Sequence, residues 1–563
     1  ARKAVVKDLE SEGLVEKIED YTNNVAYSQR GNVPIEFYLS EQWFMAMQDL
    51  AQPALEAVQT NRVRIYPEHW GKTYVHWLEN IQDWCISRQL WWGQRIPVWY
   101  RKGADRSDPA ERHVSVDGPP DPENWEQDED VLDTWFSSAL WPHSTLGWPE
   151  ETSELERYYS TDVLLTGFDI IFFWVARMMM MGLHFMDDVP FHTVYIHALV
   201  RDEKGQKMSK SKGNIIDPLE LIDKFGADAL RFMLTALAAQ GRDVRLSESR
   251  VEGYRNFVTK LWNAARFCEM NECRPVANFD PVEAKLTVNR WIIGKVRDAE
   301  AAMTGALQAY RFNDAASALY HFTWGTFCDW YVELVKPILN GDDEAARAET
   351  RATAAWVLDQ ILHLLHPIMP FVTEELWQQL GDNRPSPLIT SAWPMLDESL
   401  SDAAVNAEMD WVVRLISQIR AVRSEMNVPP KALVPLLLKD AGSKAGAAME
   451  THGELIKRLA RLDSLGLLEG EVPKGAVQDV IDEATIVLPI TDVIDIAAEQ
   501  ARLEKEIAKL DGEVKRFEGK LANEKFTAKA PPAVVETERE RLEDACQARD
   551  KMNEALGRLT AAG

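Results

Sequence analysis

Residues 207–211 have the sequence Lys207-Met208-Ser209-Lys210-Ser211 and decide how the surrounding chain is read. The apolar, β-branched run 194–200 precedes this loop, and the helix-like run 218–225 follows it. The pattern predicts a loop that leaves the end of a buried strand and leads into a helix. In open α/β sheets ligands bind at this edge. Lysines there meet phosphates as point charges, and serines add hydroxyl donors.

Two other interpretations of the loop need to be weighed. It is not a Walker loop, because the string G-x-x-x-x-G-K-[ST] does not occur in the sequence. A lysine-rich loop with flanking glycines is also typical of a solvated basic turn without a ligand.

A strand, a helix and a second strand stand upstream of the loop. Residues 162–167 and 193–200 read as buried strands, and the apolar run 170–186 between them reads as a helix. This order predicts a βαβ unit and a parallel sheet. The apolar run 168–186 is long enough to raise the question of a membrane span, but Asp169, Arg177 and His184 within it favour a buried core helix.

The composition limits which partners the protein can bind and in which cellular compartment it is expected. A chain of 563 residues is expected to hold several domains. Its net charge of -27 excludes binding of nucleic acid by bulk charge, so any RNA contact needs local basic patches. The five cysteines form no C-x-x-C pair, which excludes a zinc knuckle and fits a reducing cytoplasm. No signal peptide is visible, and the start at Ala1 in mid-pattern suggests a fragment.

Tryptophans are dense between residues 77 and 99. Such density usually reflects packing in a core or an interface, which composition favours here. The alternative is stacking on a base or packing on a substrate.

Helical periodicity dominates after the loop. Residues 217–239 predict two short helices that break at Gly226, with Asp228 capping near the start of the second. Between about 249 and 380 the pattern predicts a helical bundle, with segments 254–271, 290–310, 314–336 and 345–364. His363 and His366 resemble a metal pair but lack carboxylates, so core or helix-end roles are favoured.

The C-terminal third changes pattern twice. Residues 432–439 and 484–490 are strand-like and 455–462 helical, which predicts a small α/β module. A heptad seam then runs from Leu503 to Leu521 and resumes from Val535 to Leu559 after a proline-containing break, predicting an antiparallel coiled-coil hairpin. Residues 501–563 carry 13 Lys+Arg and 13 Asp+Glu inside an acidic protein. Besides RNA contact, a dimer zipper or a spacer remains open for the hairpin.

Several strings, in order, resemble the valyl-tRNA synthetases, a family of class Ia aminoacyl-tRNA synthetases. They are residues 83–100, 128–149, 161–181, 195–218 with the KMSKS signature, and 251–267. The C-terminal heptads also look valyl-type, whereas isoleucyl relatives typically end in a cysteine-rich metal module and leucyl relatives lack the arm. The alternatives are an isoleucyl- or leucyl-type synthetase, a tRNA-binding fragment without chemistry, or a coiled-coil assembly platform.

The resemblance implies an α/β fold followed by helices. Residues 1–40 would end an editing insertion, 41–245 would be the second half of a Rossmann-type catalytic domain, 246–400 a helical anticodon-binding domain, 401–495 the small α/β module, and 496–563 a coiled-coil tRNA-binding arm.

The resemblance also implies ATP-dependent ligation of L-valine to tRNA(Val) through valyl-adenylate, with Mg²⁺ accompanying ATP. Lys207 and Lys210 would hold the pyrophosphate charge, and Ser209 and Ser211 would orient the loop. The further implied residues are Gly167, Asp169, His197, Val200 and Met208 for ATP, Trp135, Ile170 and Ile171 for valine, and Lys515, Arg516, Lys520, Lys525 and Lys529 for tRNA. The structural alternative for Asp169 is a helix N-cap. The structural alternative for the three valine residues is a place in the hydrophobic core.

The chain also departs from the family pattern. None of its eleven histidines lies in an H-x-G-H string, so the HIGH half of the nucleotide fold is expected to be missing and the isolated chain inactive. Ser28 and Gly31 stand where relatives often carry a cysteine pair, so no structural zinc is expected. Ala198 follows the histidine where the family usually has glycine. We expect a monomer without membrane contact.

Overall fold

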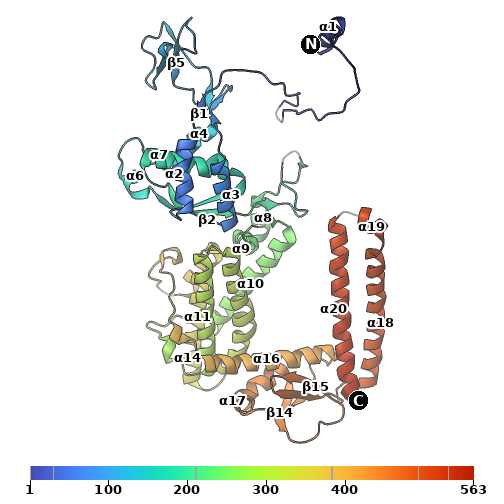
Figure 1. Ribbon diagram of the computed structural model, residues 1–563. Coiled ribbons are helices and arrows are strands. Elements are labelled where there is room, and N and C mark those ends of the chain that lie inside the picture. The colour runs from blue at the N-terminus through green and yellow to red at the C-terminus, as the bar shows by residue number, and fades with distance from the viewer. Residues whose placement is uncertain are drawn as a thin grey trace. The chain divides into compact units, whose positions relative to one another are not determined.

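The computed structural model describes residues 2–28, 31–209, 212–241, 243–381, 384–491, 493–529 and 532–562. The chain falls into two compact units, Ala1–Ile196 and His197–Gly563 (Figure 1). Each unit is described by itself.

The first unit combines helices with short strands. Its elements are α1 (Arg2–Ser11), β1 (Phe44–Met45), α2 (Gln48–Gln59), β2 (Arg64–Tyr66), α3 (Glu68–Glu79), β3 (Trp84–Cys85), β4 (Ser87–Arg88), β5 (Val98–Arg101), η1 (Pro109–Glu111), β6 (Arg112–Val114), β7 (Trp125–Gln127), β8 (Val131–Leu132), α4 (Thr134–Ala139), α5 (Trp141–Ser144), α6 (Ser153–Tyr158), β9 (Thr161–Gly167), η2 (Phe168–Ile170), η3 (Ile171–Val175), α7 (Ala176–Met186) and β10 (Phe191–His197).

The predicted βαβ unit is present. Strands β2, β10 and β9 form a sheet in that order, and β10 runs parallel to β2. The Thr161 N–H donates to the Pro190 carbonyl at 3.0 Å, which places the starts of β9 and β10 side by side. The two strands therefore run in the same direction, and their carboxyl ends lie at the same edge.

The helical run between β9 and β10 is buried as predicted. Met178, Met179 and Met180 are each at most 1% exposed and pack with α2, α3 and the sheet in one core. Within the described residues, Phe168–Met186 is long and apolar enough to cross a membrane, but the core helix of a globular unit meets the same criterion. The run is not one regular α-helix, because η2 is a 3₁₀ turn and η3 a π-helical turn.

The tryptophan-rich stretch is only partly packed. Trp84 is 7% exposed, and the Trp99 indole N–H donates to the Ser115 carbonyl at 3.1 Å. Trp91 and Trp92 are instead 107% and 92% exposed. Core packing is therefore not found for these two residues, which precede Gly93 in a bend.

The second unit is mainly helical. Its elements are β11 (Val200–Arg201), α8 (Pro218–Phe225), α9 (Ala227–Leu237), β12 (Val244–Arg245), α10 (Glu248–Met270), η5 (Pro281–Glu283), α11 (Thr287–Gln308), α12 (Phe312–Tyr320), η6 (His321–Tyr331), α13 (Val332–Leu339), α14 (Glu344–Leu365), α15 (Pro370–Leu380), η7 (Leu388–Thr390), η8 (Glu398–Leu400), α16 (Ala403–Glu425), β13 (Val434–Lys439), α17 (Ser443–Ala460), β14 (Leu462–Leu468), β15 (Ala476–Ile481), β16 (Ala484–Pro489), α18 (Ile496–Leu521), α19 (Glu524–Lys529) and α20 (Pro532–Ala562).

The break between α8 and α9 is confirmed at Gly226, which has φ +88°. The cap assigned to Asp228 is wrong. Its carboxylate lies inside the first turn of α9 and accepts from the backbone N–H groups of Phe371 and Val372, at 3.2 and 2.7 Å. Asp228 thus accepts hydrogen bonds from free N–H groups in the first turn of α15. The local sequence does not reveal this partner.

The helical bundle forms around the core shared by α10 to α15. The predicted helix over 314–336 contains the π-helical segment η6, with Tyr331 at its end. The Tyr331 hydroxyl is buried and donates to the Asn289 side-chain oxygen at 2.9 Å. Burial raises the pKa of Tyr331 well above its usual value, so the hydroxyl keeps the proton that this bond needs.

The small α/β module has four strands in the order β14-β13-β16-β15. The two predicted strands are confirmed as β13 and β16. Strands β14 and β15 were not predicted, and Leu462 begins β14 instead of ending the helix. β14 pairs with β13 in parallel, a contact across the intervening helix α17.

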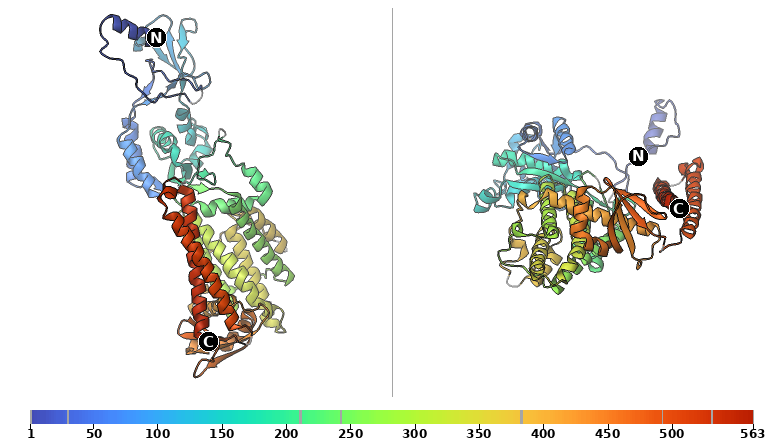
Figure 2. Two further views of the ribbon diagram at one scale, coloured as in Figure 1. Left: turned by 90° about the vertical axis from the view of Figure 1, so that its right-hand side faces the viewer. Right: turned by 90° about the horizontal axis from the view of Figure 1, so that it is seen from below.

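The last two long helices pack side by side, as both views of Figure 2 show. Leu503 in α18 and Leu559 in α20 lie in the core of the α/β module, while Val514, Phe517 and Ala545 form a separate apolar cluster farther along. Arg558 also binds Glu425 of α16 and Asp479 of β15, at 2.6 and 3.5 Å. The base of the helix pair is therefore anchored in the module.

A half-buried ion pair offers a test of the bundle. Asp359 accepts both guanidinium N–H groups of Arg384 at 2.8 and 2.7 Å, and this guanidinium lies 3.5 Å above the Trp377 ring. Asp359→Ala leaves a half-buried guanidinium without its carboxylate, so we expect a loss of about 1.5–3 kcal/mol of unfolding free energy, measured by urea denaturation of the helical signal. Glu454 forms an exposed ion pair with Lys457 and is the control. Glu454→Ala should lower the unfolding free energy by less than about 0.5 kcal/mol. Equal effects of the two changes would contradict this account.

Candidate functional site

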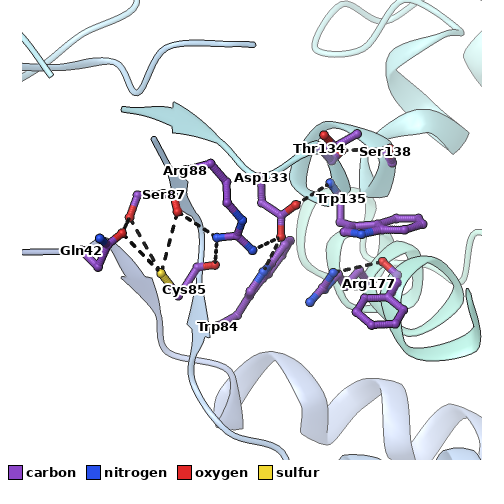
Figure 3. A network of polar contacts seen from close by, with 11 residues as sticks. Gln42, Trp84, Cys85, Ser87, Arg88, Asp133, Thr134, Trp135, Ser138 and Arg177 are labelled. Atoms are coloured by element: carbon purple, nitrogen blue, oxygen red, sulfur yellow. Dashed lines mark hydrogen bonds and ion pairs between the residues drawn. The ribbon is translucent and has the colours of Figure 1, made fainter. Parts of the chain in front are cut away.

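An open cavity of about 440 Å³ lies in the first unit, next to α4. Figure 3 shows the polar network on one side of it. Its lining includes Asp83, Arg88, Asp133 and Arg177, so two carboxylates and two guanidinium groups converge there. Three indoles, those of Trp77, Trp84 and Trp135, also line it.

The Asp133 carboxylate is the centre of this network. It accepts from Arg88 Nη2 at 2.7 Å, from Trp84 Nε1 at 3.1 Å and from the backbone N–H of Trp135 at 3.3 Å (Figure 3). The last bond makes Asp133 the N-cap of α4. Since Asp133 is only 6% exposed, one buried carboxylate fixes both the start of α4 and the side chain of Arg88.

Arg177 belongs to α7 and lines the same cavity. Its guanidinium carbon lies 3.8 Å from the centroid of Trp84, and Nη1 donates to the Phe173 carbonyl at 3.3 Å. Burial lowers the pKa of Arg177 to about 10, partly offset by Asp133. The side chain still carries its charge at neutral pH, held by an aromatic face.

The residues implied for valine do not all line this cavity. Trp135 lines it and stacks on Phe173, with ring centroids 5.5 Å apart. Ile171 is 1% exposed within the core of the unit, and Ile170 is half-buried in η2. The structure brings Trp135 together with Phe173 instead.

Two of the residues implied for ATP stand at the carboxyl end of β9. Gly167 is buried and occupies the N-cap position of η2, where no side-chain capping bond is made. Asp169 is exposed within η2, so the helix-cap alternative for this residue is wrong. Its carboxylate is available to solvent beside the end of a parallel strand, the position at which α/β folds bind ribose.

The second unit begins with the strand end that leads to the KMSKS loop. His197 is exposed and its Nδ1 lies 2.9 Å from the Ala198 carbonyl. Val200 starts β11, which pairs in parallel with β12. An ion pair between Arg201 and Asp243 ties the two strands together. The implied nucleotide residues thus fall in both units, Gly167 and Asp169 in the first and the others in the second.

The loop itself starts as a tight hairpin. Arg201 and Lys207 bridge antiparallel, and Gly205 occupies the left-handed region with φ +75°. The Gly205 N–H donates to the Asp202 carbonyl at 2.9 Å, as expected for a turn followed by a left-handed residue. Lys207 is exposed, whereas Met208 and Ser209 are half-buried. Lys210 and Ser211 lie outside the described residues.

The basic residues implied for tRNA lie on the helix pair near α19. Lys515 and Arg516 are exposed on α18. Lys520 is exposed too but binds the Glu538 carboxylate at 2.8 Å, and this bond lowers the pKa of Glu538. Lys525 and Lys529 belong to α19, and their side chains lie outside the described part of the chain.

Across the described ranges, no group of three or more His, Cys, Asp or Glu side chains is placed to hold a metal ion. His363 Nδ1 lies 2.8 Å from the Asp359 carbonyl, and His366 Nδ1 lies 2.8 Å from Thr373 Oγ1, so both rings are used within the bundle.

Comparison with known proteins decides the family. Residues 3–247 match the model of class I tRNA synthetases (I, L, M and V), residues 289–438 the anticodon-binding domain of tRNA ligase, and residues 495–560 the valyl-tRNA synthetase tRNA-binding arm. The valine–tRNA ligase of Mesorhizobium japonicum is 53% identical over 588 aligned residues that include 100% of this chain. The chain belongs to the valine–tRNA ligase family.

Further relatives agree. The valine–tRNA ligase of Brucella suis is 53% identical over 99% of this chain. The chain spans 63% and 62% of the lengths of these two relatives. Mycobacterium tuberculosis methionyl-tRNA synthetase, in complex with methionyl-adenylate, has a TM-score of 0.50 at 21% identity, covering 65% of this chain and 68% of that structure. It supports a class I synthetase fold.

Sequence reasoning missed the residues that hold the site together. Asp133 stands just before the helical run of α4, so an N-cap signal was present for it, but nothing local points to Arg88 or Trp84 as its partners. Asn214, which follows the KMSKS loop, was likewise not singled out, although its side chain contacts the loop.

The Asp133 network predicts a measurable loss of stability. Asp133→Ala removes the cap of α4 and leaves the Trp84 indole N–H and Arg88 Nη2 without their acceptor, so we expect a loss of about 2–4 kcal/mol in chemical denaturation. The exposed neighbour Glu129, changed to Ala, is the matched control. A change within about 0.5 kcal/mol for Asp133→Ala would show that the network does not support α4.

Proposed function

We propose that the protein to which this chain belongs ligates L-valine to tRNA(Val) in two steps. Valine attacks the α-phosphate of ATP and gives valyl-adenylate and pyrophosphate, and a terminal ribose hydroxyl of the tRNA then takes the valyl group. The observation that carries this proposal is the KMSKS loop after β10, in a chain 53% identical over its whole length to a valine–tRNA ligase. ATP enters with Mg²⁺ as its substrate form.

In the first step, the loop supplies charge. In-line displacement at phosphorus needs positioning and charge stabilisation more than a protein nucleophile. Lys207 and Lys210 hold the negative charge that grows on the leaving pyrophosphate, Ser209 and Ser211 orient the loop, and Met208 contacts the nucleotide. The exposed side chain of Lys207 supports this role.

The nucleotide and the amino acid are bound by separate sets of residues. Asp169 accepts from the ribose hydroxyls, and Gly167, His197 and Val200 flank the adenosine. What supports this is the exposed Asp169 carboxylate at the end of β9. Trp135 is the wall of the valine site, supported by its place in the cavity beside α4. Half-buried Ile170 is the second residue of the assignment, whereas the core position of Ile171 gives no support to a contact with valine.

The tRNA is bound by the helical domain and by the C-terminal helix pair, which we infer to be an antiparallel coiled coil. The match to the tRNA-binding arm over residues 495–560 supports this. Exposed Lys515 and Arg516 contact phosphates, and Lys520, Lys525 and Lys529 extend the basic surface. We infer that the enzyme works as a cytoplasmic monomer.

The loop lysines provide the main test. In a full-length enzyme that contains this chain, Lys207→Ala and Lys210→Ala should each lower the rate of valine-dependent ATP–pyrophosphate exchange about a hundredfold, because each removes a preorganised charge donor. Lys204→Ala, which removes an exposed lysine from the preceding turn, is the control. Exchange within a few-fold of the wild type in both loop variants would refute the assignment.

The role of the arm in tRNA binding is tested by neutralising two basic side chains and not by deleting the helices. Removing α18 and α20 would take Leu503, Ala555 and Leu559 out of the core of the module, so its effect would be ambiguous. Lys515→Gln with Arg516→Gln should raise the KM for tRNA and reduce the slope of log affinity against log salt by about one per lost contact. Lys505→Gln with Lys551→Gln, away from α19, is the control pair. An unchanged salt slope, or a change in oligomeric state alone, would favour the dimer-zipper alternative.

A further inference from the structure

The side chain of Asn214 reaches back across the loop that precedes it. Asn214 Oδ1 accepts from the Ser209 backbone N–H at 3.0 Å. Its Nδ2 donates to Asp202 Oδ2 at 2.9 Å and to the Lys207 carbonyl at 3.3 Å. One amide therefore contacts the loop at three points, two of them inside the KMSKS sequence.

Asp202 completes the arrangement from the other side. Its Oδ1 accepts from the Gln206 backbone N–H at 2.6 Å, and its backbone N–H donates to the Gln206 carbonyl at 3.1 Å. The bond from Asn214 lowers the pKa of Asp202, so the carboxylate is ionised at neutral pH. Asp202 and Asn214 thus form a clasp that closes the segment between them.

The partners of the clasp determine how the Asn214 amide is oriented. If the Asn214 amide were reversed, its nitrogen would face the Ser209 N–H and its oxygen would face the Asp202 carboxylate. Both contacts would be repulsive, so only one orientation satisfies all partners. A carboxylate at position 202 and an amide at 214 is therefore a matched pair.

We propose that the Asp202–Asn214 clasp is a positioning device for the KMSKS loop, which sets the backbone at Lys207 and Ser209 in the geometry that adenylate formation needs. This inference rests on the proposed function and adds to it two residues that do not themselves touch the substrate. Lys207 bears the charge, and the clasp determines where that charge stands. Misplacement of a positioned group by about 1 Å can cost about a hundredfold in rate.

Single and paired substitutions in a full-length enzyme test the clasp. Asn214→Asp places two carboxylates against each other, and Asp202→Asn places two amide nitrogens against each other. Each should lower kcat for ATP–pyrophosphate exchange about 10- to 100-fold, with the KM for valine changed less than about twofold. The double variant D202N/N214D restores a donor–acceptor pair and keeps an acceptor for the Ser209 N–H. It should recover kcat to well above that of either single variant, but not to the wild-type value, because the new carboxylate at position 214 faces the Lys207 carbonyl without a donor.

A second measurement reports the clasp without catalysis. In the 563-residue chain, hydrogen exchange at the Ser209 amide should be about tenfold faster in Asn214→Ala than in the wild type, because its acceptor is removed. Glu203→Gln changes an exposed charge in the same turn and should alter neither exchange nor rate. Additive losses in the double variant would overturn the clasp. If Lys207→Ala and Lys210→Ala abolish catalysis while the clasp variants remain normal, this inference fails and the proposed function stands.

Discussion

The parallel pairing of β9 with β10 is the constraint on which the arrangement of the candidate site depends. Parallel neighbours need a crossover, and a crossover that packs against the sheet must be apolar on the side it buries. This explains why α7 carries consecutive methionines that are almost fully buried. It also sets Gly167 and His197 at strand ends on one edge, because Thr161 and Pro190 are hydrogen-bonded at the other. The apolar helix is thus a consequence of placing the ends of β9 and β10 at the same edge of the sheet.

Elements whose signals are local were predictable from the sequence. The strands β9 and β10, the buried helix between them and the break at Gly226 follow from hydrophobic period and from a residue that tolerates positive φ. Much of the bundle was also predictable, because long amphipathic segments such as α11 and α14 repeat their apolar positions over several turns. The KMSKS loop could be found as a string, although its geometry could not.

What could not be predicted depends on partners far away in the chain. Asp228 looks like a helix cap, yet it serves the start of α15, 143 and 144 residues farther on. Strand β14 is recognisable only through its parallel pairing with β13. The Asp133 network joins residues from separate strands, so neither Arg88 nor Trp84 carries a local sign of its role. Only Asn214 is near its partners in sequence, and there the signal was missed because asparagine after glycine usually indicates a simple turn.

Charge compensation changes how the basic residues of the arm should be counted. A protein with a net charge of -27 repels RNA at long range, so affinity must come from cations that lack a nearby carboxylate. Lys520 is paired with buried Glu538, and Arg549 binds both Asp511 and Asp550. Their charges are already neutralised at short range, whereas Lys515 and Arg516 stand exposed on the same helix as Lys520. The number of phosphates that the arm can neutralise is therefore smaller than its number of basic residues. For the tRNA contact that we propose, this predicts a shallow salt dependence, because the slope counts phosphate contacts and not lysines.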